Sequence, residues 1–283
     1  MILCVVGPTG VGKTKLSIEL AKKYNGIVVN ADSMQVYKEL NIGTAKVTEE
    51  EKENIEHILF DIVNPDEMYT VYDYQKDLRK VLNDNKDRNI IMVGGTGLYI
   101  KAALYNYIFN EEEDNNEYEE LTNEELYKLV CIKDKKSDIH INNRKRMIRF
   151  LNRSETPKDK DNLLYDVKFI GLTTDRETLY DRINKRVDIM IEDGLIEEVK
   201  KLYDKNIRSK AIMTGIGYKE LYEYFDGNIS LTDAIDLIKS RSRKYAKRQY
   251  TWFNNQMNVK WFDVDFEEFN NTINKIIEYI KED

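Results

Sequence analysis

The sequence predicts an α/β fold in which a parallel sheet is flanked by helices. Short runs rich in β-branched residues alternate with longer segments of helical periodicity. A loop and usually a helix follow each short run, which is the order of β-α-β units with parallel strands. From residue 175 almost to the end of the chain the pattern is helical. We therefore expect an α/β part first and a helical C-terminal part after it.

The strands are expected at six short apolar runs. In chain order these are 2–6, 27–30, 58–61, 90–93, 168–172 and a last one at 259–262. Helices are expected at 13–24 and 71–83, where apolar residues recur at helical spacing. Residues 104–137 interrupt the alternation with an acidic run and one amphipathic stretch, which indicates a small helical insertion. The core domain is then formed by 1–103 and 138–283.

Composition argues against several classes of protein. Hydrophobic residues make up 41% and charged residues 34%, which is typical of a globular chain with a strongly solvated surface. No stretch approaches the roughly 20 apolar residues that cross a bilayer, so we expect no membrane partner. Two cysteines and two histidines argue against a disulfide framework and against a zinc site. Met1 leads directly into the first strand, without the basic segment of a signal peptide, and we expect a cytoplasmic protein.

The segment 7–14 matches the phosphate-binding pattern G-x-x-x-x-G-K-[ST] in full, between the first strand and the first helix. Its glycines let backbone N–H groups turn toward an anion, and the helix that begins near Lys13 adds its positive end. Lys13 supplies a charge to the outer phosphate, and Thr14 supplies a hydroxyl for Mg²⁺, the cofactor we expect. The residues expected at the phosphates are Gly7, Thr9, Gly10, Gly12, Lys13 and Thr14. The fold is thus P-loop NTPase-like, but kinases, NTPases and transferases of diphosphate esters all use this loop.

Two further loops follow strands that end at the same edge of the sheet. Asp32 comes just after the second expected strand, so it should face the phosphate loop. A carboxylate at this place can be a Mg²⁺ ligand, a general base or a helix N-cap. The segment 94–97, Gly-Gly-Thr-Gly, follows the fourth strand and lets the backbone approach a ligand closely.

The order of these motifs resembles that of the bacterial tRNA dimethylallyltransferases, also called isopentenylpyrophosphate transferases. GPTGVGKT at 7–14 is followed by DSMQVY at 32–37, IGTAK at 42–46 and GGTGLY at 94–99. Further motifs of that family match at 139–149, 186–195, 215–220 and 243–253. The resemblance covers nearly the whole chain. Its exception is 104–137, which is shorter and more acidic than the insertion domain expected of the family.

Members of this family transfer a dimethylallyl group from dimethylallyl diphosphate to the exocyclic N6 amine of the adenine 3′ of the anticodon. The resemblance implies that the tRNA anticodon stem-loop and dimethylallyl diphosphate are the partners. The loop at 7–14 then holds the leaving diphosphate, and Lys13, Mg²⁺ and the backbone donors stabilise its charge. Asp32 resembles the general base of the family, and Thr96 resembles the residue near the reacting amine. Arg186 matches a family motif and is expected on the diphosphate, unless it pairs with a neighbouring aspartate.

The DSMQ motif is expected at the adenine. The resemblance implies contacts from Asp32, Ser33, Met34, Gln35 and Thr96. A glutamine amide offers the donor and acceptor that adenine requires, although the amide of Gln35 can equally hold a turn.

A net charge of −7 does not suggest a nucleic-acid-binding protein, but the basic residues are clustered. On a helix over 239–252, the cations cover about half of the circumference and apolar residues the other side. No acidic residue interrupts this segment, which favours contact with phosphates over an ordinary solvated face. A second basic stripe comprises Arg146, Arg149 and Arg153. The residues expected at the tRNA are Arg146, Arg149, Arg243, Lys247 and Arg248.

Two other functions remain open from the sequence. An isopentenyltransferase acting on free adenine nucleotides would use the same donor, but it needs no basic helix. A small-molecule kinase would bind ATP at the same loop, but the DSMQ and GGTG motifs do not resemble a kinase acceptor site. We expect the protein to act as a monomer.

Overall fold

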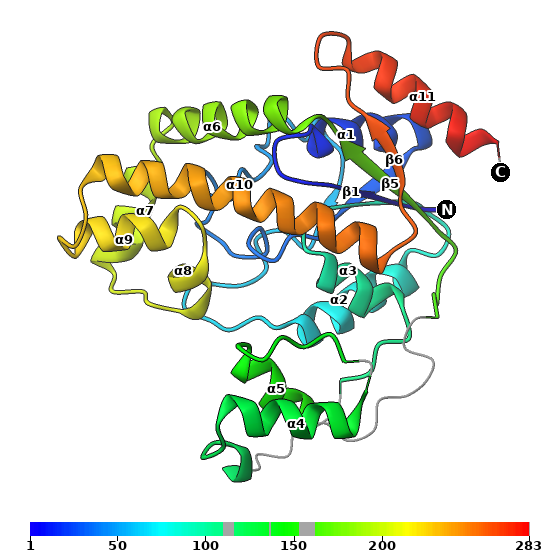
Figure 1. Ribbon diagram of the computed structural model, residues 1–283. Helices are drawn as coiled ribbons and strands as arrows, with labels where there is room; N and C mark the ends of the chain where they lie inside the picture. The colour runs from blue at the N-terminus through cyan, green and yellow to red at the C-terminus, as the bar shows by residue number, and fades with distance from the viewer. Residues whose placement is uncertain (110–115, 136, 153–161, 283) are drawn as a thin grey trace. The chain divides into compact units, whose positions relative to one another are not determined.

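The computed structural model describes residues 1–109, 116–135, 137–152 and 162–282 (Figure 1). Two compact units are present. One is formed by Met1–Leu104 together with Leu164–Asp283, and the other by Tyr105–Leu163. No helix in the described part of the chain is both long enough and apolar enough to cross a membrane.

The first unit is built around a parallel sheet of six strands, which confirms the predicted fold class. The strands are β1 (Ile2–Val6), β2 (Gly26–Asn30), β3 (His57–Ile58), β4 (Asn89–Val93), β5 (Val167–Thr173) and β6 (Lys260–Asp263). Their order across the sheet is β3-β2-β4-β1-β5-β6, and every neighbouring pair is parallel. The carboxyl ends of all strands therefore meet at one edge, which is where ligands bind in sheets of this kind.

Helices cover the sheet and continue into the C-terminal part. They are α1 (Lys13–Tyr24), α2 (Val71–Asp84), α3 (Gly97–Leu104), α6 (Arg176–Glu192), α7 (Leu195–Asp204), α8 (Lys210–Thr214), α9 (Tyr218–Phe225), α10 (Leu231–Gln256) and α11 (Phe269–Lys281). One buried cluster joins the strands to α1 and α11, and a second joins α7, α8 and α9 to the first half of α10. The long helix α10 runs beside α6 and α9 (Figure 1).

The second unit contains a short 3-10 helix, η1 (Asn116–Tyr118), and two α-helices, α4 (Asn123–Lys133) and α5 (Arg144–Leu151). It extends to Leu163, whereas the sequence placed the end of the insertion at 137. The reason is packing, because α5 contributes Met147 and Leu151 to the same small core as the apolar residues of α4. The described residues 138–152 therefore belong with α4 in this unit. Arg153, predicted in the second basic stripe, lies outside the described residues.

Candidate functional site

The phosphate loop joins β1 to α1 in a conformation that requires glycine. Gly7, Gly10 and Gly12 have φ angles of +139°, +90° and +91°, which side chains disfavour. A Cβ at Gly7 would come within 2.5 Å of the Leu172 carbonyl oxygen, and one at Gly12 within 2.8 Å of the Phe269 ring. The loop is thus packed between β5 and α11, and the predicted residues lie together at the carboxyl end of β1.

Lys13 is half-buried at the first position of α1. Its ammonium donates to the Pro8 carbonyl oxygen at 2.7 Å. The pKa of Lys13 is lowered to about 8, chiefly by burial and also by the charge of Arg186, while the carboxylate of Asp32 acts in the opposite direction. Lys13, Arg186 and Asp32, predicted from three distant motifs, are therefore close enough to affect one another.

Asp32 follows β2 and is fixed by its neighbours. The side chain of Asn30 accepts the Asp32 backbone N–H at 2.8 Å and donates to the Asp32 carbonyl oxygen at 3.0 Å. Asp32 Oδ1 accepts the Met34 N–H at 2.9 Å, so it caps a turn where a helix N-cap was considered from the sequence. Oδ2 faces the second glycine-rich loop, since a Cβ at Gly95 would lie 3.8 Å from it. One oxygen thus caps the turn, and the other is directed at the site.

The pKa of the Asp32 carboxyl is raised, chiefly because the group is buried. Backbone N–H groups of Met34 and Gln35 and the charges of Lys13 and Arg186 act against this rise. A carboxylate whose pKa lies above its ordinary range holds a proton more readily, which suits a group that accepts a proton during a reaction.

The second glycine-rich loop approaches its neighbours without room for side chains. A Cβ at Gly94 would lie 2.2 Å from the Ala31 backbone, and one at Gly97 would lie 2.0 Å from the Trp252 ring. This close approach brings Thr96 beside Ser33. Thr96 Oγ1 accepts the Ser33 N–H at 2.9 Å and donates to Ser33 Oγ at 3.2 Å. The hydroxyls of the two predicted residues form one polar pair next to Asp32.

Gln35 holds a turn. Its side-chain amide donates to the carbonyl oxygens of Thr44 and Ala45 at 3.0 and 3.3 Å, which is the structural role considered from the sequence. The start of the same turn is fixed by Glu198, whose carboxylate accepts three successive backbone N–H groups at 41–43. Met34 packs against Gly215, where a Cβ would come 2.7 Å from its terminal methyl group. These contacts give the DSMQ and IGTAK motifs a shared rigid frame.

Arg182 and Arg186 of α6 approach the phosphate loop differently. Arg182 Nε donates to the Gly10 carbonyl oxygen at 2.9 Å, and its guanidinium lies 3.8 Å from the Phe266 ring centroid. Arg186 is half-buried and makes no hydrogen bond or ion pair with any residue that the structure describes. The alternative that Arg186 pairs with Asp181 or Asp188 is not observed among the described residues, and Asp188 pairs instead with Lys239 at 2.5 Å. Arg182 thus stabilises the loop by a hydrogen bond, whereas the charge of Arg186 can interact with a bound anion.

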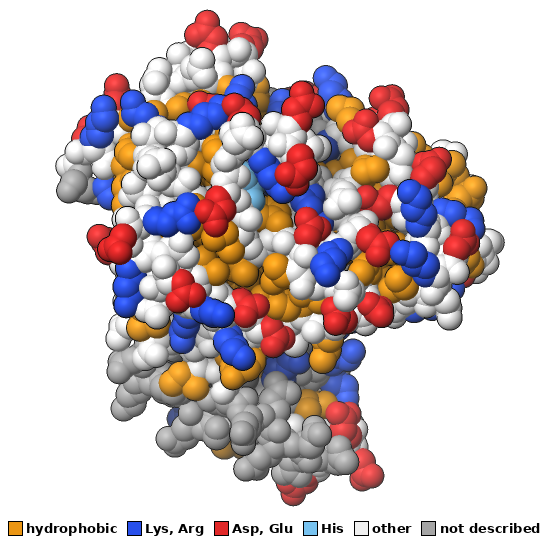
Figure 2. All heavy atoms as spheres, turned by 180° about the vertical axis from the view of Figure 1, so that it is seen from behind, with side chains coloured by type: hydrophobic (Ala, Val, Ile, Leu, Met, Phe, Trp, Pro, Cys, Tyr) orange, Lys and Arg blue, Asp and Glu red, His pale blue; other side chains and the backbone are white. Residues whose placement is uncertain are grey.

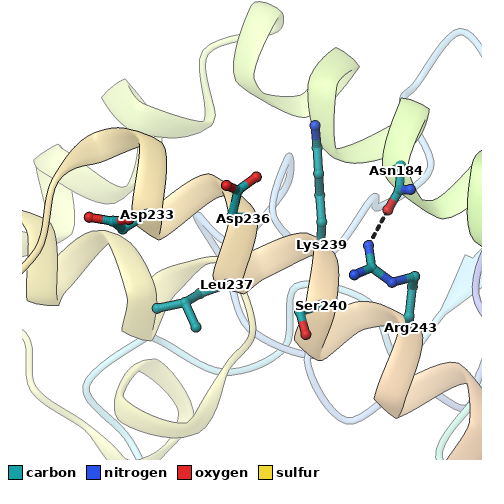
Figure 3. A pocket seen from close by; sticks show the side chains of 7 residues that line it. All are labelled: Asn184, Asp233, Asp236, Leu237, Lys239, Ser240 and Arg243. Atoms are coloured by element: carbon teal, nitrogen blue, oxygen red, sulfur yellow. Dashed lines mark hydrogen bonds between the residues drawn. The ribbon is translucent and has the colours of Figure 1, made fainter.

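The basic segment of α10 is only partly free. Lys239 pairs with Asp188 on α6, Arg241 pairs with the buried Glu220 on α9, and Arg243 donates to Asn184 Oδ1 at 2.5 Å. Figure 3 shows Arg243 directed at Asn184, beside a hollow of about 670 Å³ along α10. The first half of the predicted outward basic face is therefore engaged with polar partners from other helices. The exposed cations are Lys244, Lys247 and Arg248.

The face of the molecule seen from behind differs from the basic segment of α10. The face drawn in Figure 2 intersperses acidic and basic side chains and has no broad basic area. In the second unit, Arg146 and Arg149 are exposed on α5, and Arg146 pairs with Asp138 at 3.0 Å. Cations suited to phosphate contact thus lie at the end of α10 in one unit and on α5 in the other.

Two residues of α10 belong to the site although the sequence, which placed them in the family motif at 243–253, gave them no role there. Gln249 Oε1 accepts the Thr9 N–H at 3.0 Å, and its Nε2 donates to the Gly95 carbonyl oxygen at 3.1 Å. The Tyr245 hydroxyl lies within interaction range of the side chains of Thr96 and Gln249. Burial raises the pKa of the Tyr245 hydroxyl, and the nearby Asp32 charge adds to the effect. The available signal was a polar glutamine on the apolar face of the helix, in line with buried Ala246 and Phe253.

Comparison with known proteins agrees with this geometry. A family model described as IPP transferase matches residues 35–256. The tRNA dimethylallyltransferase of Anoxybacillus flavithermus is 48% identical and aligned over 99% of this chain and 96% of its own. That of Bacillus anthracis is 45% identical, with 98% and 95% covered.

Solved structures give the same result. The tRNA delta(2)-isopentenylpyrophosphate transferase of Staphylococcus epidermidis is 42% identical, with a TM-score of 0.78 over 99% of this chain and 98% of that one. A eukaryotic dimethylallyltransferase acting on tRNA is 28% identical, with a TM-score of 0.83 over 100% of this chain and 78% of its own. The resemblance predicted from the motifs is confirmed, and the chain belongs to the IPP transferase family of transferases.

Proposed function

We propose that this protein is a tRNA dimethylallyltransferase. It transfers the dimethylallyl group of dimethylallyl diphosphate to the N6 amine of the adenine 3′ of the anticodon and releases diphosphate. The observation that carries the proposal is the meeting of three groups at one sheet edge. The half-buried Lys13 and Arg186 offer charge to a diphosphate, and the carboxyl of Asp32 lies within their electrostatic reach.

The leaving group is assigned to the phosphate loop. As the allylic C–O bond breaks, its electron pair remains on the diphosphate, and the added charge is stabilised by the loop N–H groups, Lys13 and Arg186. Arg186 is suited to this role because it has no hydrogen-bond or ion-pair partner among the described residues and lies near Lys13. Thr14 is the second residue of α1, directly after Lys13, and its hydroxyl would hold Mg²⁺, which when bound neutralises further phosphate charge.

The acceptor is assigned to Asp32 and its hydroxyl neighbours. The adenine amine donates its electron pair to the allylic carbon, forming the C–N bond, and its proton passes to Asp32. An exocyclic adenine amine is a weak nucleophile, so removal of the proton must accompany attack. The Thr96 and Ser33 pair, hydrogen-bonded at the adjoining loop, is placed to orient the amine and fix its distance from Asp32.

Phosphates of the tRNA anticodon stem-loop are assigned to the exposed cations. On α10 these are Lys247 and Arg248, with Lys244 beside them, and on α5 they are Arg146 and Arg149. Arg243 contributes less than the sequence suggested, because its guanidinium is engaged with Asn184. The proposed location is the cytoplasm and the proposed active form is a monomer, for which sedimentation at assay concentration should give the mass of one chain.

The deciding experiment offers three substrates to the same enzyme. Labelled dimethylallyl diphosphate is incubated with unmodified anticodon stem-loop or with AMP, and ATP turnover is followed separately. We expect label on the stem-loop alone. Transfer to AMP only would identify a free-nucleotide isopentenyltransferase, and ATP turnover without prenyl transfer would identify a kinase.

The role of Asp32 is tested by Asp32→Asn, which keeps the side-chain shape and removes the base. We expect loss of transfer by about 10²-fold or more, with little change in stem-loop affinity. Asp66→Asn is the matched control, because Asp66 is exposed and far along the chain from the three loops. A wild-type rate of transfer in Asp32→Asn would show that Asp32 only caps the turn and is not the base.

A further inference from the structure

Gln249 of α10 is the one described side chain that bonds directly to both glycine-rich loops of the site. Its carbonyl oxygen accepts from Thr9 in the phosphate loop, and its amide nitrogen donates to Gly95 in the loop that carries Thr96. The residue is only 5% exposed. A Cβ at Gly95 would lie 2.0 Å from the Gln249 nitrogen, so the loop backbone touches the amide directly.

The contact reaches further through Tyr245, one turn earlier on the same helix. The Tyr245 hydroxyl lies within interaction range of Gln249 and Thr96, and Thr96 donates to Ser33 Oγ. Polar contacts therefore lead from the Thr9 N–H, through Gln249 and Tyr245 of α10, to the hydroxyl pair beside Asp32. The oxygen and the nitrogen of the Gln249 amide each have a partner, Thr9 and Gly95, which fixes the orientation of the amide.

Side chains from two helices, α10 and α6, form hydrogen bonds with neighbouring residues of the phosphate loop. Gln249 holds the Thr9 N–H, and Arg182 of α6 holds the Gly10 carbonyl oxygen. The remaining N–H groups of the loop are thereby aimed in fixed directions. The direction of these N–H donors determines how well the loop stabilises a bound anion, because hydrogen bonds weaken when they lengthen or bend.

We propose that Gln249 is a positioning residue for prenyl transfer, which sets the distance and orientation of the diphosphate loop relative to the loop of Thr96. It acts through these loops and touches neither reactant. The inference rests on the proposed function, since the two loops hold the donor and the acceptor only in that reaction. Misplacement of reacting groups by about 1 Å can lower a rate by about 10²-fold.

The test uses Gln249→Met, which keeps the length and approximate volume of the side chain and removes both hydrogen bonds. Gln75→Met is the matched control. Gln75 is also buried and donates to the Ala102 carbonyl oxygen at 2.6 Å, between α2 and α3. Each variant removes a buried amide, so any general decrease in stability is shared.

Transfer is measured in single turnover, with the enzyme saturated by dimethylallyl diphosphate and stem-loop. We expect the rate of Gln249→Met to fall about 10- to 100-fold at unchanged stem-loop affinity, and that of Gln75→Met to stay near wild type. Equal rate losses in the two variants, or a wild-type rate for Gln249→Met, would overturn the proposal.

The role of Gln249 can also be tested without prenyl transfer, and in a second variant. Affinity for inorganic diphosphate with Mg²⁺, measured by calorimetry, should fall in Gln249→Met and not in Gln75→Met, and it requires no transfer. Failure of the unaltered enzyme to label the stem-loop would thus reject the proposed function alone. If Gln249→Met does not fold, Gln249→Glu keeps the acceptor for Thr9 and removes the donor to Gly95. A reduced rate in that variant supports the proposal, and a wild-type rate overturns it.

Discussion

The ion pair between α9 and α10 makes a quantitative prediction about how α10 is held. The Glu220 side chain is 1% exposed, and its carboxylate accepts the Gly217 N–H at 2.8 Å and pairs with Arg241. In Arg241→Met, the carboxylate keeps only the backbone donor among the described residues. Breaking a buried ion pair by removing one partner costs about 3–5 kcal/mol. Because the Arg241 side chain is 39% exposed, we expect a loss near the lower end, about 3 kcal/mol.

The free energy of unfolding is measured by urea titration of each variant. Arg208→Met is the control, because Arg208 and its partner Asp226 have side chains 43% and 30% exposed. An exposed pair of this kind contributes less than about 1 kcal/mol. Adding Glu220→Gln to Arg241→Met removes the stranded charge and should restore most of the stability. A decrease in Arg241→Met no greater than that in Arg208→Met would refute the reasoning.

Three further predictions concern the site. Since the pKa of Lys13 is about 8, its charge is lost as the pH rises through this value, and affinity for inorganic diphosphate should fall there. Calorimetry across this range should show the fall in the unaltered protein and not in Lys13→Met, and equal slopes would contradict it. Because burial raises the pKa of Asp32, its charged form destabilises the fold above the ordinary aspartate pKa of about 4. Asp32→Asn should therefore unfold at a higher urea concentration than wild type at neutral pH. This difference in stability should disappear as the pH falls to about 4. Lower stability of Asp32→Asn at neutral pH would argue against the buried charge. Replacing Lys247 and Arg248 by Gln should reduce the slope of log tRNA affinity against log salt by about 0.7–0.9 for each phosphate that the side chains no longer reach, and an unchanged slope would mean that neither touches a phosphate.

Local patterns predicted the α/β elements closely. Helix 13–24 was predicted with its observed bounds, because a glycine at the N-cap and a positive φ at Asn25 stop it at both ends. The third strand was expected at 58–61 but is confined to His57–Ile58. Leu59 and Asp61 adopt φ angles of +65° and +54°, which no extended strand permits, and the apolar pattern alone does not reveal this turn.

Contacts across long stretches of chain were not predictable in the same way. The acid-free segment of α10 suggested a free basic face, yet Asp188 and Glu220 reach it from α6 and α9. Gln249 was matched to a family motif but given no role for the same reason, since its partner Thr9 lies 240 residues away. A motif places residues at an edge of the sheet, but only the packing of distant helices determines which of them remain free to bind.

The contact between Trp252 and Gly97 gives the protein an intrinsic optical probe. The chain has two tryptophans, and the second, Trp261, lies on β6 with its ring centroid 4.9 Å from that of Tyr250. In Trp261→Phe, all indole emission would come from a ring in contact with the loop that carries Thr96. Occupancy of the acceptor side can then be followed by fluorescence in real time, without a label on either reactant.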